Sequence, residues 1–217
     1  MKVISFVTQK GGAGKSTLAA CLAVAAEAAG ERVFLLDLDP QGSLTSWRKT
    51  RTAESPPVDA VSPAKLSAAL TALAKNGYTL AMIDTAGADA PATTAAMTNA
   101  DLCIIPSRPT AFDVRATKVT RDNLETMGRD YVFVLNQCPP SARGTRAMDG
   151  KRTLEMMGMV VSPAVANRVD FQEAILQGLG VTELHPNSKS AQEIAELWTA
   201  IKKNHLGERK HGKRQPI

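Results

Sequence analysis

The sequence predicts an α/β fold with a mostly parallel, twisted sheet of about seven strands and helices on both faces. Three observations support this prediction. Several apolar runs show no alternation of polar and apolar side chains, as expected for strands that are covered on both faces. Alanine-rich or amphipathic segments of helical length separate these runs. The first run ends in a glycine-rich turn that leads directly into one of the helical segments.

The glycine-rich turn has the sequence KGGAGKST and spans Lys10–Thr17. It lies between an expected strand over residues 2–8 and an expected helix over residues 15–29. In this setting the glycines let successive backbone N–H groups surround an anion, and the helix N-terminus adds partial positive charge. We expect Lys15 to reach the terminal phosphates of a nucleotide and the Ser16 hydroxyl to bind Mg²⁺. The expected phosphate cradle comprises Gly11, Gly12, Ala13, Gly14, Lys15, Ser16 and Thr17.

The turn departs from the common phosphate-loop pattern at its first position. That pattern begins with a glycine five residues before the Gly-Lys pair, and Gln9 stands there in this chain. A second lysine, Lys10, follows at the mouth of the loop. A turn that only joins a strand to a helix would not explain two lysines beside three glycines.

Acidic side chains follow the next two expected strands, which span residues 32–37 and 78–83. Asp37 and Asp39 lie at the end of the earlier strand, and Asp84 follows the later one. Because ligands bind at the carboxyl ends of strands in open α/β sheets, we expect all three carboxylates to face the phosphate loop. A carboxylate in the position of Asp84 typically holds Mg²⁺ through a water molecule. Taken alone, such aspartates are also typical of turns.

The remaining segments continue the alternation of strands and helices. We predict that residues 50–62 form a surface connection, that Trp47 packs against the core before it, and that a helix runs from Pro63 to about residue 76. Asp113 stands near the start of a later helix, where a negative charge stabilises the N-terminus. Further strands are expected over residues 102–105, 131–135 and 159–161, and further helices over about 113–127 and 188–204.

The composition indicates one globular domain, which we place over residues 1–205. The 217 residues are 44% hydrophobic and 22% charged, as in ordinary soluble domains. No apolar run approaches the ~20 residues that span a bilayer, and the N-terminus enters a strand at once, so we expect a cytoplasmic protein without a signal peptide. The cysteines have no paired spacing and are expected to be buried thiols: Cys21, Cys103 and Cys138.

Positive charge is concentrated at the C-terminus. The chain has a formal net charge of +5, and the residues up to 201 hold equal numbers of acidic and basic side chains. We expect residues 206–217 to form a basic, disordered tail, either as a solvated terminus or as a contact for a polyanion. The tail has no apolar face, which argues against membrane insertion. The basic residues are Lys202, Lys203, Arg209, Lys210, Lys213 and Arg214, against the single acid Glu208.

In their order along the chain, these motifs resemble the ParA/MinD family of ATPases, whose phosphate loop is a deviant Walker A motif. The resemblance extends from Lys2 to about Lys203. It implies a P-loop NTPase fold, ATP or ADP with Mg²⁺ as cofactors, and a dimer that encloses its nucleotides. It also implies that Lys10 crosses the dimer interface to the partner's phosphates and that Asp39 positions the attacking water.

The resemblance suggests roles for residues that the pattern alone leaves open. Asp37 would lie in the outer shell of Mg²⁺, and the segment from Asp84 to Gly87 would respond to the γ-phosphate. Asn136 would contact the adenine ring, although an asparagine at a strand end is also ordinary turn chemistry. Asp113 would lie near the dimer interface. The metal site implied in this way consists of Ser16, Asp37 and Asp84.

For function, the resemblance implies a dimer that binds non-specific nucleoid DNA in the ATP state. A ParB-type partner would stimulate hydrolysis, and the cycle would partition plasmid or chromosome DNA. Since the loop is reached by residue 10, we expect no DNA-binding domain before it. One alternative is the same switch acting on a protein cargo, such as a chemoreceptor cluster or a microcompartment. Another is a small-molecule ligase or kinase similar to dethiobiotin synthetase. The candidate DNA contacts are Arg168, Lys202 and Lys203.

Overall fold

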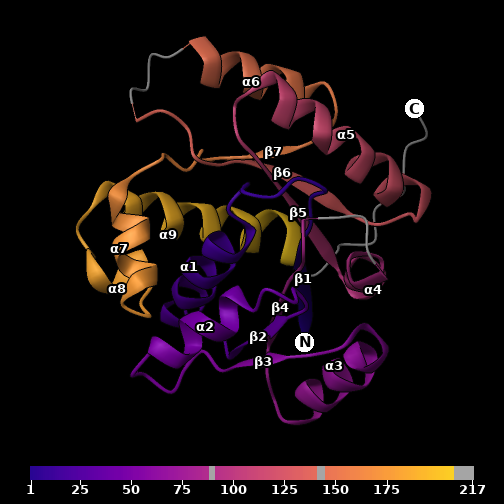
Figure 1. Cartoon of the computed structure of the whole chain (residues 1–217), viewed down its shortest axis with the longest axis vertical. Helices are drawn as coiled ribbons and strands as arrows, with labels where there is room; N and C mark the ends of the chain where they lie inside the picture. Colours follow the sequence, from indigo (N-terminus) through magenta and orange to yellow (C-terminus); the bar gives the residue numbers. More distant parts are fainter. Residues whose placement is uncertain (88–90, 141–144, 208–217) are drawn as a thin grey trace.

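Seven strands form one sheet in the computed structural model, which describes residues 1–87, 91–140 and 145–207 (Figure 1). Every neighbouring pair of strands is parallel, and the order across the sheet is β3-β2-β4-β1-β5-β6-β7. This confirms the predicted fold class. The strands are β1 (Lys2–Phe6), β2 (Val33–Asp37), β3 (Val58–Ala60), β4 (Leu80–Asp84), β5 (Leu102–Ser107), β6 (Tyr131–Leu135) and β7 (Val160–Val161).

Helices cover both faces of the sheet (Figure 1). One layer contains α1 (Lys15–Ala28), α2 (Ser43–Thr50), α7 (Val169–Leu176), α8 (Val181–Leu184) and α9 (Lys189–Ile201). The other layer contains α3 (Leu66–Lys75), α4 (Pro91–Asn99), α5 (Ala111–Thr126) and α6 (Thr145–Glu155). A 3₁₀ turn, Pro63–Lys65, precedes α3, and a π-helical turn, Lys202–Leu206, continues α9.

Both faces of the central strands are buried, which explains why these runs show no polar alternation. Along β1, Ile4 and Phe6 pack on the side of α1 and α9. Val3 packs with α3 on the opposite side. All three side chains are buried. A strand enclosed in this way favours apolar residues on both faces, as the sequence indicated, and the buried Ser5 satisfies its hydroxyl by donating to the carbonyl oxygen of Ala96 at 3.0 Å.

The prediction that residues 50–62 form a surface connection is partly wrong. Val58–Ala60 forms the edge strand β3 beside β2, and Arg51 is buried. A strand of three residues with two exposed side chains leaves little apolar pattern to detect. Trp47 is buried, as predicted. The helices α2, α4, α7 and α8 were also not predicted, because none is longer than nine residues and so short a segment gives little helical periodicity to detect.

Other expectations concern the cysteines, the C-terminus and membranes. All three cysteines are buried and free, and burial raises the pKa of Cys21 and of Cys103 to about 12. Most of the predicted basic tail, residues 208–217, lies outside the described residues. Within the described ranges, no helix is long and apolar enough to cross a membrane.

The first prediction concerns the core beneath the phosphate loop. Ile104 on β5 is fully buried among residues of β1, α1 and α9. We expect Ile104→Ala to lower the free energy of unfolding by about 3 kcal/mol, because it removes apolar contacts and leaves a cavity. Urea denaturation measures the change. Val119→Ala, at an exposed position of α5, is the control and should change it by less than about 0.5 kcal/mol. Equal effects at the two sites would contradict this packing.

Candidate functional site

The glycine-rich turn lies between the end of the central strand β1 and the start of α1. Gly12 and Gly14 adopt positive φ angles of 77° and 83°, a conformation that side chains with a Cβ rarely adopt. Lys15 is the first residue of α1, directly after Gly14. The loop and the first turn of α1 line one cavity. This arrangement is typical of a phosphate site, and phosphate binding by these residues stays a prediction.

Two amide side chains from the end of β6 hold the loop in place. The Nδ2 of Asn136 donates to the carbonyl oxygen of Ala13 at 2.9 Å, and the Nε2 of Gln137 donates to that of Gly12 at 3.2 Å. A Cβ on Gly14 would lie only 2.5 Å from the Nδ2 of Asn136, so the loop and this brace require a glycine there. The structure thus gives Asn136 a bracing role beside its predicted contact with the base. We did not predict Gln137, which differs from other strand-end residues in its φ of 52°.

Lys15 and Asp84 are buried together under the loop. Asp84 is 0% exposed, and its carboxylate accepts no hydrogen bond of good geometry within the described residues. Burial raises the pKa of Asp84 to about 7, although the nearby Ser16 hydroxyl opposes this increase. Burial also lowers the pKa of Lys15, and the negative charges of Asp84 and Asp39 oppose this decrease. An unpaired buried carboxylate at this point is a strong site for a cation.

The chemistry of the site fits Mg²⁺ bound together with a nucleotide. Among the described residues, no group of three or more His, Cys, Asp or Glu side chains could hold a metal ion by itself. Mg²⁺ commonly takes one or two protein oxygens and completes its shell with water and substrate phosphates. Ser16 and Asp84 would supply the protein side of this arrangement, with phosphate oxygens from the nucleotide in the loop.

Asp37 and Asp39 differ in their surroundings. Asp37 is paired with Asp84 across β2 and β4 and is buried. Its carboxylate accepts hydrogen bonds from the backbone of Asp39 at 3.1 Å and from both the backbone and the hydroxyl of Thr45, at 2.9 and 2.7 Å. Asp37 therefore fixes the start of α2. Asp39 is only half-buried and lines the cavity over the phosphate loop.

Gly87 lies against the opposite side of the loop. A Cβ there would lie 2.8 Å from the backbone nitrogen of Gly11, closer than real contacts allow. The segment after β4 therefore touches the phosphate loop directly through its backbone. A displacement of the phosphate loop would therefore displace the segment after β4, and the reverse also holds. This is consistent with the predicted response of Gly87 to the γ-phosphate.

Lys10 lies outside the cradle, at its mouth. Its Nζ is 2.7 Å from a carboxylate oxygen of Asp113, and the Lys10 side chain is 35% exposed. Asp113 is buried at the start of α5, where it also contacts Arg108 and the capping residue Thr110. Burial alone would raise the pKa of Asp113, but the hydrogen bonds from Lys10, Thr110 and Arg108 outweigh it and lower the pKa. Asp113 therefore holds Lys10 as well as stabilising the helix.

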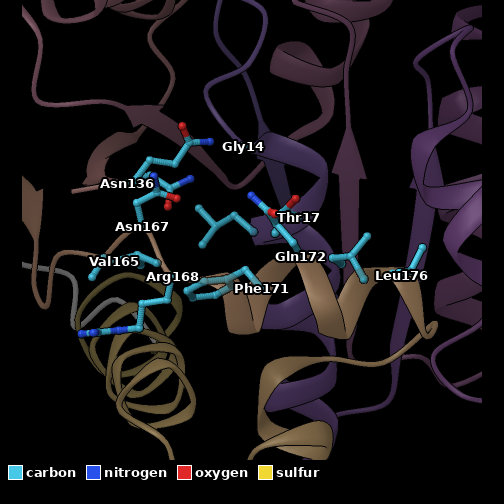
Figure 2. A pocket seen from close by; sticks show the side chains of 13 residues that line it. Gly14, Thr17, Asn136, Val165, Asn167, Arg168, Phe171, Gln172 and Leu176 are labelled. Carbon is cyan, nitrogen blue, oxygen red and sulfur yellow. The ribbon is translucent and has the colours of Figure 1, made fainter. Parts of the chain in front are cut away.

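Two adjoining cavities surround the loop. The first, of about 360 Å³, is lined by side chains from α7, from the end of β6 and from the loop before α7, including Asn136, Val165 and Phe171 (Figure 2). The second, of about 350 Å³, contains Lys15, Ser16 and Asp39. Gly14, Thr17 and Ile175 line both. A mostly apolar cavity beside a phosphate cradle can hold a nucleobase while the cradle holds the phosphates.

The structure does not bring the three candidate DNA contacts together. Arg168 lines the first cavity and forms an ion pair with Glu193 of α9 at 2.5 Å. Lys202 follows the other end of α9 and pairs with Glu31 at 2.7 Å. Residues 193 and 202 are nine positions apart, which corresponds to about 14 Å of helix. Lys203 is exposed beside Lys202, so these two remain neighbours and Arg168 does not join them.

Comparisons with known proteins agree with this geometry. The CobQ/CobB/MinD/ParA nucleotide binding domain matches residues 4–59. The chain is 33% identical to the maintenance of carboxysome distribution protein A of Gloeobacter kilaueensis, over 88% of each chain. It is 27% identical to protein ParA of Rhizobium radiobacter, over 79% of this chain and 81% of the relative. The septum site-determining protein MinD of Pyrococcus horikoshii, complexed with Mg-ADP, has the same fold, with a TM-score of 0.77 and 19% identity over 93% of this chain and 96% of that one.

The second prediction concerns Asp84. We expect Asp84→Asn to stabilise the nucleotide-free protein by about 2 kcal/mol near neutral pH, because it removes a buried, unpaired charge. The pKa of Asp84 is about 7 in the folded protein and the usual value is 3.8. The buried charge therefore destabilises the folded wild type fully above its folded-state pKa, and this destabilisation disappears as the pH falls and the carboxylate is protonated. Thermal unfolding in a chelator should therefore show an advantage for the variant that shrinks between about pH 8 and pH 5.

The same variant should lose the stabilisation that Mg–nucleotide gives to the wild type, because the cation then lacks its protein carboxylate. Asp59→Asn makes the same change of charge at an exposed position of β3 and is the control, with both properties expected to stay near wild type. An Asp84→Asn protein that is less stable in the chelator, or that still responds fully to Mg–nucleotide, would contradict the assignment.

Proposed function

Since the chain belongs to the ParA/MinD family of nucleotide-binding ATPases, we propose that it is an ATP-dependent dimerising switch that partitions DNA. In this proposal the ATP-bound dimer binds non-specific duplex DNA of the nucleoid in the cytoplasm. A ParB-type adaptor then stimulates hydrolysis and releases the protein from DNA. The cycle moves a plasmid or chromosome relative to the nucleoid.

The observation that carries the proposal is the placement of two lysines on opposite sides of the phosphate loop. Lys15 is buried within the cradle, where it serves the nucleotide of its own subunit. Lys10 lies at the mouth with a half-exposed side chain, and within the described ranges its ion-pair partner is the carboxylate of Asp113. A cation in this position is suited to the phosphates of a nucleotide in a second subunit. Dimerisation would transfer Lys10 from Asp113 to those phosphates.

Hydrolysis in this arrangement depends on positioning and neutralisation of charge. Mg²⁺, when bound, neutralises the phosphate oxygens that gain charge as the terminal bond breaks. Lys15 and the partner's Lys10 would stabilise the same oxygens, and the half-buried Asp39 would orient the attacking water. Until Lys10 arrives the site lacks part of this charge, so a monomer should hydrolyse ATP slowly. A slow basal rate of ATP hydrolysis allows the adaptor to control the cycle by stimulating hydrolysis.

Contacts with DNA are proposed for the C-terminal end of α9. Lys203 is exposed there beside Lys202, and exposed lysines can neutralise backbone phosphates without reading sequence. Arg168 is a weaker candidate than the sequence suggested, since Glu193 already pairs with it and it borders the nucleobase cavity.

Positioning of a protein cargo is the second candidate function. The likeness to the carboxysome distribution protein extends over 88% of both chains, so the same switch could act on a protein assembly rather than on DNA as its cargo. The nucleotide and DNA steps are common to both candidates, and the adaptor distinguishes them. A metabolic ligase or kinase similar to dethiobiotin synthetase would instead show turnover that depends on a small-molecule substrate.

The third prediction is that binding to random-sequence duplex DNA requires ATP. Binding should be strong with Mg–ATP at low salt, weak with ADP or without nucleotide, and steeply reduced at higher salt, because phosphate contacts release counterions. Fluorescence anisotropy with a labelled duplex measures it. Lys10→Ala should bind ATP yet fail to bind DNA, since it cannot complete the dimer.

Charge variants locate the contact surface and serve as controls. Lys203→Glu should weaken DNA binding about tenfold or more. Lys75→Glu, the same change on exposed α3 in the opposite helical layer, should have little effect. DNA binding that does not depend on nucleotide would refute the ATP-dependent switch. The absence of DNA binding under every condition would instead favour a metabolic ligase or kinase.

A further inference from the structure

An ion pair between the buried Arg51, which directly follows α2, and the half-buried Glu183 of α8 clamps the end of α2 to the segment that follows α7. The Arg51 side chain is only 2% exposed, and its guanidinium donates to both carboxylate oxygens of Glu183, at 2.8 and 2.6 Å. It also donates to the carbonyl oxygens of Ser55 at 2.7 Å and Gly178 at 3.0 Å. Bidentate pairs of this kind fix orientation as well as distance.

The backbones meet closely at the same point. Gly178 has a φ of 71°, and a Cβ there would lie 2.5 Å from the backbone nitrogen of Arg51. The indole Nε1 of Trp47, one turn earlier on α2, donates to the carbonyl oxygen of Leu179 at 3.2 Å. The Arg51 guanidinium lies over the same indole ring, 5.1 Å from its centre. The end of α2 and the loop after α7 therefore form one tightly packed unit.

The other end of α2 borders the cavity over the phosphate loop, which Ser43 and Leu44 line. Asp37 fixes the first turn through Thr45, as described above. Asp39, which is proposed to orient the attacking water, lies just before this turn. Because α2 has only eight residues, a displacement of its clamped end changes the position of the segment that carries Asp39.

The clamped loop continues from the wall of the nucleobase cavity. Phe171, Gln172 and Ile175 of α7 line that cavity (Figure 2). Ile175 also lines the phosphate cavity together with Leu44 and Trp47 of α2. The helix α7 thus contacts both the space for the base and the helix that follows Asp39.

We propose that Arg51 is a positioning residue that couples occupancy of the nucleobase cavity to the placement of Asp39. A base in the cavity favours one position of α7. The loop after α7 and the short helix α8 transmit that position to α2, because separating Arg51 from Glu183 would leave the buried Arg51 guanidinium without its carboxylate partner. The proposal rests on the proposed hydrolysis of ATP and adds that the base, as well as the phosphates, prepares the site.

A ligand without a base separates this coupling from a purely structural ion pair. Mg–tripolyphosphate occupies the phosphate cradle and leaves the nucleobase cavity empty. If Arg51 only stabilises the fold, its loss will have the same effect on both ligands. If it transmits occupancy of the base cavity, its loss will remove only the part of the response that ATP has beyond tripolyphosphate.

The fourth prediction uses ¹⁹F NMR of protein labelled with 5-fluorotryptophan. The two tryptophans, Trp47 on α2 and Trp198 on α9, give one resonance each, and Trp198→Phe assigns them. In the wild type, Mg–ATP should shift the Trp47 resonance more than Mg–tripolyphosphate does, at concentrations of tripolyphosphate that displace a fluorescent ATP analogue. The Trp198 resonance should stay in its folded position throughout.

In Arg51→Met and in the nearly isosteric Glu183→Gln, the shift caused by ATP should fall to that caused by tripolyphosphate. We expect kcat for ATP hydrolysis to fall about tenfold or more with KM changed less, since misplacement of a positioned group affects the chemical step. Lys49→Met, at an exposed position of the same helix, is the control and should behave as the wild type. Glu183→Gln provides the test if Arg51→Met does not fold.

Two results would overturn the proposal. One is equal Trp47 shifts with ATP and tripolyphosphate in the wild type. The other is a wild-type shift and wild-type kcat in both clamp variants. Failure of the proposed function is separate, because the NMR shifts need only nucleotide binding. A protein that shows the coupled shifts but never dimerises or binds DNA would refute the proposed dimerising switch and would leave the proposed coupling through Arg51 supported.

Discussion

A buried carboxylate that accepts no hydrogen bond of good geometry within the described residues is the constraint on which the site depends. Asp84 ends a central strand, and its charge is costly in this position without a cation. Lys15 lies above it and is itself partly desolvated. The parallel sheet creates this situation, because it brings the ends of its strands to the same edge as the phosphate loop. The nucleotide-free site is therefore held in a state that Mg²⁺ and phosphate relieve.

The surrounding segments keep that edge in a fixed geometry and link it to the parts that respond. Asn136 and Gln137 brace the loop from one side, and Gly87 touches it from the other. The helix α2 is anchored at its start by Asp37 and at its end by the pair of Arg51 with Glu183. Each of these contacts connects the loop or the proposed water-positioning segment to a different strand or helix. A change at the nucleotide can thus reach several surfaces of the protein.

Much of this site could be predicted from the sequence because local patterns encode it. The glycine-rich turn, the apolar strands and the aspartate that ends β4 are adjacent in sequence to the elements that place them. The Arg51 clamp could not be predicted, because its partner, Glu183, lies 132 residues away and a lone arginine after a short helix resembles a surface residue. Gln137 escaped notice for a similar reason, since only its backbone conformation distinguishes it. The DNA candidates were chosen by charge alone, and the ion pair with Glu193 makes Arg168 a weaker candidate than its charge suggested.

Mixing of two inactive variants tests most directly whether Lys10 acts across a dimer. Lys10→Ala keeps its own Asp39 but lacks the lysine that its partner needs, whereas Asp39→Ala keeps Lys10 but cannot orient the water. In a mixed dimer, the Lys10→Ala subunit regains a complete site by receiving Lys10 from its partner. We predict that each variant alone hydrolyses ATP at a negligible rate and that the mixture recovers a substantial fraction of wild-type activity. A mixture as inactive as its components would contradict the transfer of Lys10 between subunits.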